Sequence, residues 1–204
     1  MNRRIALLAA LAATFAAVSL GRAQQSVPPT PEAAVEQLLD GLVSAAQAHG
    51  GEPVEARYEA LRPVVAATHD LPYIAELTIR REWRDLSDEQ RQRFVDAFER
   101  LSVMTYASRF GSLEEGMFVL GGSEPPSDGR AVVTATLTTA QGDEIPFEYV
   151  LHEADGGWKI INILADNVSD LALKRAEYRR LLADGTIEDV IAELERQAAA
   201  AAGR

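Results

Sequence analysis

Residues 83–110 read WRDLSDEQRQRFVDAFERLSVMTYASRF, and this stretch decides most of the fold. Ser87 and Gln90 stand three residues apart just before an apolar run, which is the spacing of a capping box. In such a box, each side chain bonds the backbone amide of the other residue. Apolar and small residues then recur every three or four positions, opposite a charged face. They are Phe94, Ala97, Phe98, Leu101, Met104, Thr105 and Ser108. The stretch therefore predicts a long amphipathic helix that ends near Phe110.

The segments before this helix also carry helix signals. Thr30 and Pro31 match an N-cap followed by a first helical position, so a helix is predicted from Pro31 to a stop at residues 49–51, His-Gly-Gly. Two shorter helices are predicted at 53–61 and 72–81. Pro63 falls in the connection between them.

After residue 116 the hydrophobic period changes from about 3.6 to 2, which is typical of strands. Strands are predicted at 117–120, 130–139, 145–152 and 158–164, separated by turn-forming residues. Helices resume at Ser169 and Thr186. The sequence therefore predicts an α+β fold, an NTF2-like cone. It has a helical N-terminal half, an antiparallel sheet of about four strands and C-terminal helices packed on the sheet.

The first 23 residues have the features of a signal peptide. Arg3 and Arg4 precede an uncharged apolar run, and small residues at Gly21 and Ala23 suit cleavage after Ala23. The alternative is an uncleaved anchor, but 16 residues at about 1.5 Å each fall short of a bilayer core of about 30 Å. The expected organisation is a leader at 1–23, a linker at 24–30, a single domain at 31–197 and a frayed tail at 198–204.

The charge of the chain limits its partners. The net charge is −11, and removal of three leader arginines leaves 17 basic against 31 acidic residues, or −14. A chain this acidic lacks the basic surface that nucleic acid requires, and it should not adhere generally to anionic membranes. The absence of cysteine excludes disulfides and thiolate chemistry.

Two blocks of sequence resemble one known family. The first has Trp-Arg, a Ser cap, Gln-Arg, two Phe four residues apart and a later Tyr, at Trp83, Arg84, Ser87, Gln90, Arg91, Phe94, Phe98 and Tyr106. The second has Trp-Lys, a Val-Ser pair and a basic-x-x-Tyr helix, at Trp158, Lys159, Val168, Ser169, Arg175 and Tyr178. Together they resemble the MlaC (toluene-tolerance, Ttg-type) family of periplasmic lipid carriers, and the second block is most similar to its HpnM branch. Asp166 and Asn167 stand where the family usually has Glu-Gly.

The resemblance implies a function and a set of partners. It implies a periplasmic, non-enzymatic carrier that binds a phospholipid or a hopanoid and moves it between inner and outer membranes, in outer-membrane lipid homeostasis. The implied partners are an inner-membrane ABC or RND transporter and an outer-membrane lipoprotein or porin complex. No metal or cofactor is expected besides the lipid.

The candidate lipid-binding residues are apolar side chains of the long helix and of one sheet face. They are Phe94, Phe98, Leu101, Met104, Val133, Leu137, Ile145, Phe147, Tyr149 and Leu151. A packed core requires the same residue types as a lipid cavity, so the sequence alone leaves both arrangements open. The resemblance favours the cavity, because the family holds acyl chains between sheet and helices with the headgroup outside.

Four arginines, Arg80, Arg81, Arg84 and Arg91, are candidates for contact with a headgroup or a partner. Interleaved acidic residues offer the alternative of a solvated, ion-paired surface. Arg84 is the strongest candidate of the four, since it follows Trp83 in the family motif.

Catalytic patterns are missing from the sequence. There is no nucleophile elbow and no phosphate-binding loop, and His49, His69 and His152 have no metal-ligand spacing. Asp166 and Asn167 are better explained by a turn before a helix than by a catalytic base. Two rival classes stay open: a small NTF2-like enzyme with a buried carboxylate, and an adaptor that binds only protein.

Overall fold

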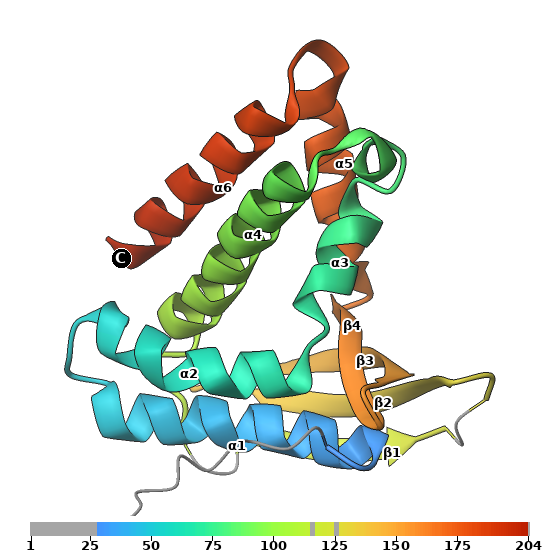
Figure 1. Ribbon diagram of the computed structural model, residues 1–204. Helices are drawn as coiled ribbons and strands as arrows, with labels where there is room; N and C mark the ends of the chain where they lie inside the picture. The colour runs from blue at the N-terminus through green and yellow to red at the C-terminus, as the bar shows by residue number, and fades with distance from the viewer. Residues whose placement is uncertain (1–27, 115–116, 125–126, 204) are drawn as a thin grey trace, which may run out of the picture.

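The computed structural model describes residues 28–203 except 115–116 and 125–126 (Figure 1). The predicted signal peptide at 1–23 lies outside the described residues, as does most of the predicted linker. Within the described part of the chain, no helix combines the length and the apolar character that a membrane crossing requires.

Three α-helices and a short 3₁₀-helix form the N-terminal half. They are α1 (Pro31–His49), α2 (Val54–Thr68), α3 (Leu71–Thr78) and η1 (Glu82–Asp85). Thr30 caps α1 through the amide of Ala33, as predicted. Helix α2 continues past its predicted end, with Pro63 inside it. Because Pro63 lies on the exposed side, the carbonyl it leaves unpaired can meet water, while the buried Leu61 and Val65 hold the helix in place.

The long helix α4 (Asp88–Arg109) confirms the strongest prediction. The amide of Ser87 donates to Oε1 of Gln90 at 3.1 Å, and the amide of Gln90 donates to Oγ of Ser87 at 3.2 Å. Both halves of the predicted capping box are therefore present.

The sheet is an antiparallel meander with strand order β1-β2-β3-β4-β5. Its strands are β1 (Phe118–Ser123), β2 (Arg130–Thr138), β3 (Glu144–Ala154), β4 (Gly157–Ala165) and β5 (Val168–Ser169). The prediction missed only β5. Asp166 and Asn167 have φ angles of 50° and 62°, so they form the tight turn from β4 to β5, and Ser169 caps the following helix. The predicted α+β class is confirmed.

The two C-terminal helices pack differently from each other. Helix α5 (Asp170–Asp184) contacts β4 and α3, whereas α6 (Ile187–Ala202) packs along α4 and not on the sheet (Figure 1). The predicted fraying from residue 198 is wrong, because α6 continues to Ala202 and Ala198 is 1 % exposed. Its apolar stripe of Val190, Leu194 and Ala198 keeps the last turns against the core.

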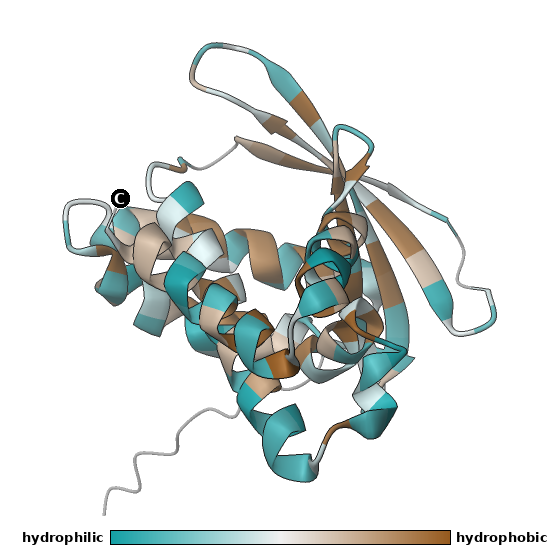
Figure 2. Ribbon diagram, turned by 90° about the horizontal axis from the view of Figure 1, so that it is seen from above, coloured by the Kyte–Doolittle hydropathy of each residue, from teal (hydrophilic) through white to brown (hydrophobic). Residues whose placement is uncertain are grey.

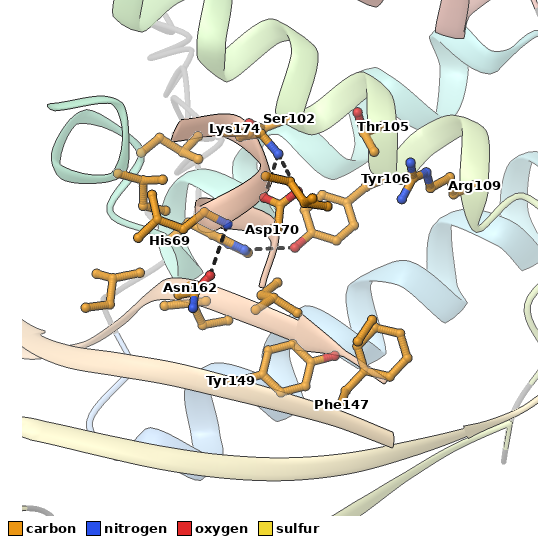
Figure 3. Close-up of a pocket in the computed structure, with 18 of the residues that line it drawn as sticks. His69, Ser102, Thr105, Tyr106, Arg109, Phe147, Tyr149, Asn162, Asp170 and Lys174 are labelled. Atoms are coloured by element: carbon orange, nitrogen blue, oxygen red, sulfur yellow. Dashed lines mark hydrogen bonds and ion pairs between the residues drawn. The ribbon is translucent and has the colours of Figure 1, made fainter. Parts of the chain in front are cut away.

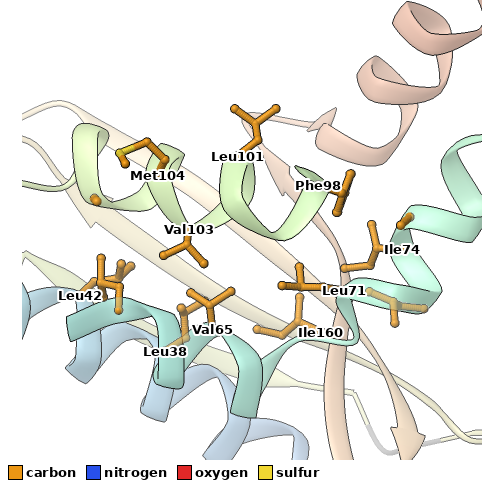
Figure 4. Close-up of a cluster of buried hydrophobic side chains, with 14 of the residues drawn as sticks. Leu38, Leu42, Val65, Leu71, Ile74, Phe98, Leu101, Val103, Met104 and Ile160 are labelled. Atoms are coloured by element: carbon orange, nitrogen blue, oxygen red, sulfur yellow. The ribbon is translucent and has the colours of Figure 1, made fainter. Parts of the chain in front are cut away.

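The helices lie together on one side of the sheet (Figure 2). The core between these layers joins Leu38 and Leu42 of α1, Val65 of α2, Phe98 of α4 and Ile160 of β4 (Figure 4). Because the two layers share one core, the fold is held together without a disulfide.

Candidate functional site

A cavity of about 290 Å³ lies between the sheet and helices α3, α4 and α5 (Figure 3). Most of its lining is apolar. The apolar lining residues are Leu42, Leu71, Ile74, Phe98, Phe110, Phe147, Tyr149, Ile160, Ile161, Ile163, Ala165, Val168, Leu171 and Leu173. Its size is near the lower end of the range of about 300–1,000 Å³ for ligand pockets.

The sheet side of the cavity is an aromatic wall. Phe147 and Tyr149 stand two residues apart on β3, so they project from the same face. Their rings stack with centroids 6.1 Å apart, and Phe118 of β1 packs edge-on against Phe147 at 5.7 Å. Ile163 pairs with Tyr149 in the next strand and continues the wall. These contacts fix the wall in position before any ligand arrives.

A chain of hydrogen bonds holds two polar residues of the cavity lining, His69 and Tyr106. The Thr68 hydroxyl donates to the Val64 carbonyl at 2.9 Å, so its oxygen is left to accept from Nδ1 of His69 at 3.0 Å. Nε2 of His69 then accepts from the Tyr106 hydroxyl at 2.9 Å. The network thus assigns the Nδ1–H tautomer to His69.

The polar chain is uncharged at neutral pH. Burial lowers the pKa of His69 to about 4, and burial also raises the pKa of Tyr106 well above its ordinary value. This part of the wall can therefore face an acyl chain without the cost of a buried ion.

The open side of the cavity lies where β5 meets α5. Val168 and Leu173 line the cavity and are 51 % and 59 % exposed, which is unusual for large apolar side chains in this protein. Lys174, also in the lining, pairs with Asp170 through Nζ at 2.5 Å. The mouth therefore combines an apolar rim with an ion pair.

The structure places only some of the predicted lipid-binding residues in the cavity lining. Phe98, Phe147 and Tyr149 line it. The remaining predicted residues lie outside the lining, in the core cluster or packed against it: Phe94, Leu101, Met104, Val133, Leu137, Ile145 and Leu151. On α4 the lining comes from an adjacent stripe through Phe98, Ser102, Thr105, Tyr106 and Arg109.

The sequence reasoning missed the contributions of β4 and α5. Strand β4 supplies four consecutive lining residues, 160–163. Its run IINIL lacks alternation, which is a signal that both faces of a strand are covered. Nothing local marked Leu173 or Lys174, because their position depends on how α5 packs against β4.

The four candidate arginines separate into two groups. Arg80, Arg81 and Arg84 lie around a second hollow, away from the cavity. Arg91 instead donates from Nε to the Trp83 carbonyl at 3.2 Å and from Nη2 to the Arg84 carbonyl at 3.3 Å. Its guanidinium also lies 5.6 Å from the centre of the Trp83 ring and pairs with Asp88. Arg91 thus secures η1 to α4.

The histidines are dispersed in the structure, as the sequence suggested. His152 pairs with Asp70 at 2.8 Å, His49 lies 3.3 Å from Glu52, and His69 belongs to the cavity wall. Among the described residues, no three potential metal ligands gather into a site. The carboxylate in the cavity lining is that of Asp170, an exposed residue already paired with Lys174.

Comparison with known proteins identifies the family. The family described as MlaC protein matches residues 32–196, which is most of the chain. The chain belongs to the MlaC family. This result confirms the resemblance predicted from the two sequence blocks, while the HpnM branch stays a prediction.

Two relatives of this MlaC-family chain extend the comparison. The toluene tolerance protein ttg2D of Pseudomonas putida is 24 % identical over 144 residues, covering 70 % of this chain and 66 % of that protein, just under two thirds of its length. A phospholipid-binding protein from Ralstonia solanacearum, solved in complex with a phospholipid, superposes with a TM-score of 0.75 at 17 % identity. That match covers 85 % of this chain and 99 % of the other, and it establishes a shared fold.

Proposed function

We propose that this protein is a lipid-binding carrier that holds phospholipid acyl chains in the cavity between its sheet and helices. The observation that carries the proposal is the apolar cavity, with an aromatic wall and an open side at Val168 and Leu173. The structural relative from Ralstonia solanacearum, with the same fold, was solved with a phospholipid. This supports the same class of ligand here.

The energetics of lipid transfer explain why such a carrier is needed. Each CH₂ group kept from water contributes about 0.8 kcal/mol, so a free diacyl lipid crosses an aqueous compartment very slowly. The cavity can shield an acyl chain, while Lys174 in the lining can meet a phosphate at the mouth. At about 290 Å³ the cavity must widen to admit two long chains.

The finer proposal is a periplasmic shuttle that serves both membranes. The predicted leader peptide and the family membership support export. We propose an inner-membrane transporter and an outer-membrane complex as exchange partners, and a hopanoid as the alternative ligand. The acidic net charge supports delivery through protein partners, because anionic bilayers would repel the carrier.

The two rival functions, an enzyme and a protein-only adaptor, predict different features of the cavity. An NTF2-like enzyme requires a buried carboxylate, whereas Asp170 in the cavity lining is exposed and paired. A protein-only adaptor requires no cavity. We therefore propose that the protein acts by binding and release of lipid, without catalysis.

Incubation with liposomes tests this function. The mature protein, first stripped of lipid, is incubated with phospholipid liposomes, separated from them and extracted. The expected result is one phospholipid for each protein molecule, detected by mass spectrometry of the extract and of the intact complex. Repeated failure to take up lipid, from these liposomes and from liposomes that also contain a hopanoid, would exclude the carrier function.

A further inference from the structure

A second hollow, of about 460 Å³, lies where the end of α3 and η1 meet α5. Figure 1 shows the C-terminal ends of α3 and α5 at the end of the molecule far from α1. Five arginines line the hollow: Arg80, Arg81, Arg84, Arg175 and Arg179. We call it the arginine hollow. It shares no lining residue with the lipid cavity, because α5 presents Lys174 to the cavity and Arg175 to the hollow.

The fold brings these five arginines together from two distant segments. Arg80 and Arg81 follow the end of α3, and Arg84 lies in η1. Arg175 and Arg179 are four residues apart on α5, so they project from the same face of that helix. The sequence alone pointed to the first segment but not to the second.

The arginine side chains of the hollow have no partners in the described structure. All five are exposed, and none of them takes part in an ion pair or a side-chain hydrogen bond within residues 28–203 as described. Glu82 is the acidic residue in the lining. Five like charges that converge on one hollow repel each other, so an anion that enters it removes an unfavourable interaction.

The surroundings of the hollow limit the shape of this anion. Asp85 of η1, Asp88 and Glu89 at the start of α4, and Asp184 at the end of α5 are exposed acidic residues on the same elements or next to them. They would repel a broad anionic surface such as a bilayer. A narrow segment that carries carboxylates presents fewer charges to these acidic residues, and guanidinium groups bind carboxylates with paired hydrogen bonds.

We propose that the arginine hollow binds an acidic segment of a partner protein and so orients the carrier during docking. This inference rests on the proposed function for its purpose, since docking serves lipid delivery. The binding itself is independent of the lipid cavity. In a chain of net charge −11, such a local basic site selects one approach direction for an acidic partner.

The test is a titration of a fluorescently labelled hexaglutamate peptide, followed by fluorescence anisotropy at low and high salt. The variant Arg81→Glu/Arg175→Glu reverses one arginine from each segment of the hollow. The matched control, Arg62→Glu/Arg180→Glu, makes the same charge change at exposed positions outside the lining, one of them on the same helix. We expect the wild type and the control to bind in a salt-sensitive manner, and the hollow variant to bind at least tenfold more weakly.

Two results would overturn the proposal. One is equal affinity of the hollow variant and the control. The other is a wild type that does not bind the peptide but sediments with phosphatidylglycerol vesicles, while the hollow variant does not sediment with them. That result would show that the hollow binds membranes. Lipid bound to each variant is measured in parallel by native mass spectrometry. A wild type that binds the peptide but never a lipid would remove the carrier function while leaving the hollow intact.

Discussion

The hydroxyl of Tyr106 lies 2.9 Å from Nε2 of His69, in the wall of the cavity between sheet and helices. Nδ1 of the same imidazole donates a hydrogen bond to the Thr68 hydroxyl at 3.0 Å. Nε2 is therefore an acceptor, and the Tyr106 hydroxyl donates its proton to it. Toward a ligand, Tyr106 can then only accept a hydrogen bond. Because the three side chains link the end of α2 to α4, the cavity wall also joins two helices.

The buried His69 makes stability depend on pH. Burial lowers its pKa from the ordinary value of 6.5 to about 4, so its contribution to stability is present above pH 6.5 and is lost as the pH falls from 6.5 to 4. The expected loss is about 3 kcal/mol of unfolding free energy. Urea unfolding at pH 7 and pH 4 measures it. The variant His69→Gln has no titrating group at this position, so its unfolding free energy should fall by about 3 kcal/mol less than that of the wild type between pH 7 and pH 4. Equal losses in the two proteins would contradict the pKa shift assigned to His69.

Tyr106→Phe removes the donor to His69 and leaves Nε2 unpaired in a buried site. The unfolding free energy should fall by about 1–2 kcal/mol at pH 7, measured by urea unfolding. Since the ring still fills the cavity wall, bound lipid should be retained. A stability equal to that of the wild type would show that the hydrogen bond contributes nothing.

Tyr178→Phe should have the opposite outcome. The Tyr178 hydroxyl is buried and has no hydrogen-bond partner among the described residues, while its ring packs edge-on against Phe94 with centroids 6.1 Å apart. Removal of an unpaired hydroxyl avoids its desolvation cost, so the unfolding free energy should stay the same or rise by about 1 kcal/mol. A clear loss of stability would indicate that a partner, such as a buried water, satisfies this hydroxyl.

The sequence predicted those features that depend on local patterns. The capping box at Ser87 and Gln90 and the strand alternation of β2 and β3 are local, and both were confirmed. Pro63 inside α2 shows the limit of such rules, because packing of Leu61 and Val65 outweighed the proline signal.

The cavity itself could not be predicted from local patterns. Phe98 lines the cavity and Leu101 does not, although the two residues are three positions apart and both are apolar. Which of them faces the open space depends on the rotation of α4 relative to α5, α6 and the sheet. The hydrogen bond between His69 and Tyr106 also depends on residues distant in sequence. The same is true of the hollow that brings Arg81 and Arg175 near each other.

Export should remove the first 23 residues. The sequence predicts that the mature protein begins at Gln24, because small residues occupy the positions before the cleavage site. N-terminal sequencing of protein recovered from the periplasm measures this directly. Recovery of a chain that begins at Met1 would indicate a retained anchor and contradict a freely diffusing carrier.

The most direct test of the lipid cavity is the mass of the native protein with and without a charge in its wall. Phe147→Asp places a carboxylate in the aromatic wall, where burial against an acyl chain is costly. Val119→Asp is the matched control, since Val119 is 58 % exposed on the same sheet and does not line the cavity. Circular dichroism first verifies that both variants are folded.

Native mass spectrometry of the three proteins, purified under mild conditions, then shows which of them carry a bound lipid. We predict that the wild type and Val119→Asp each carry one lipid that is released on denaturation, and that folded Phe147→Asp carries none. Lipid retained equally by Phe147→Asp and the wild type would contradict the assignment of this cavity as the lipid site.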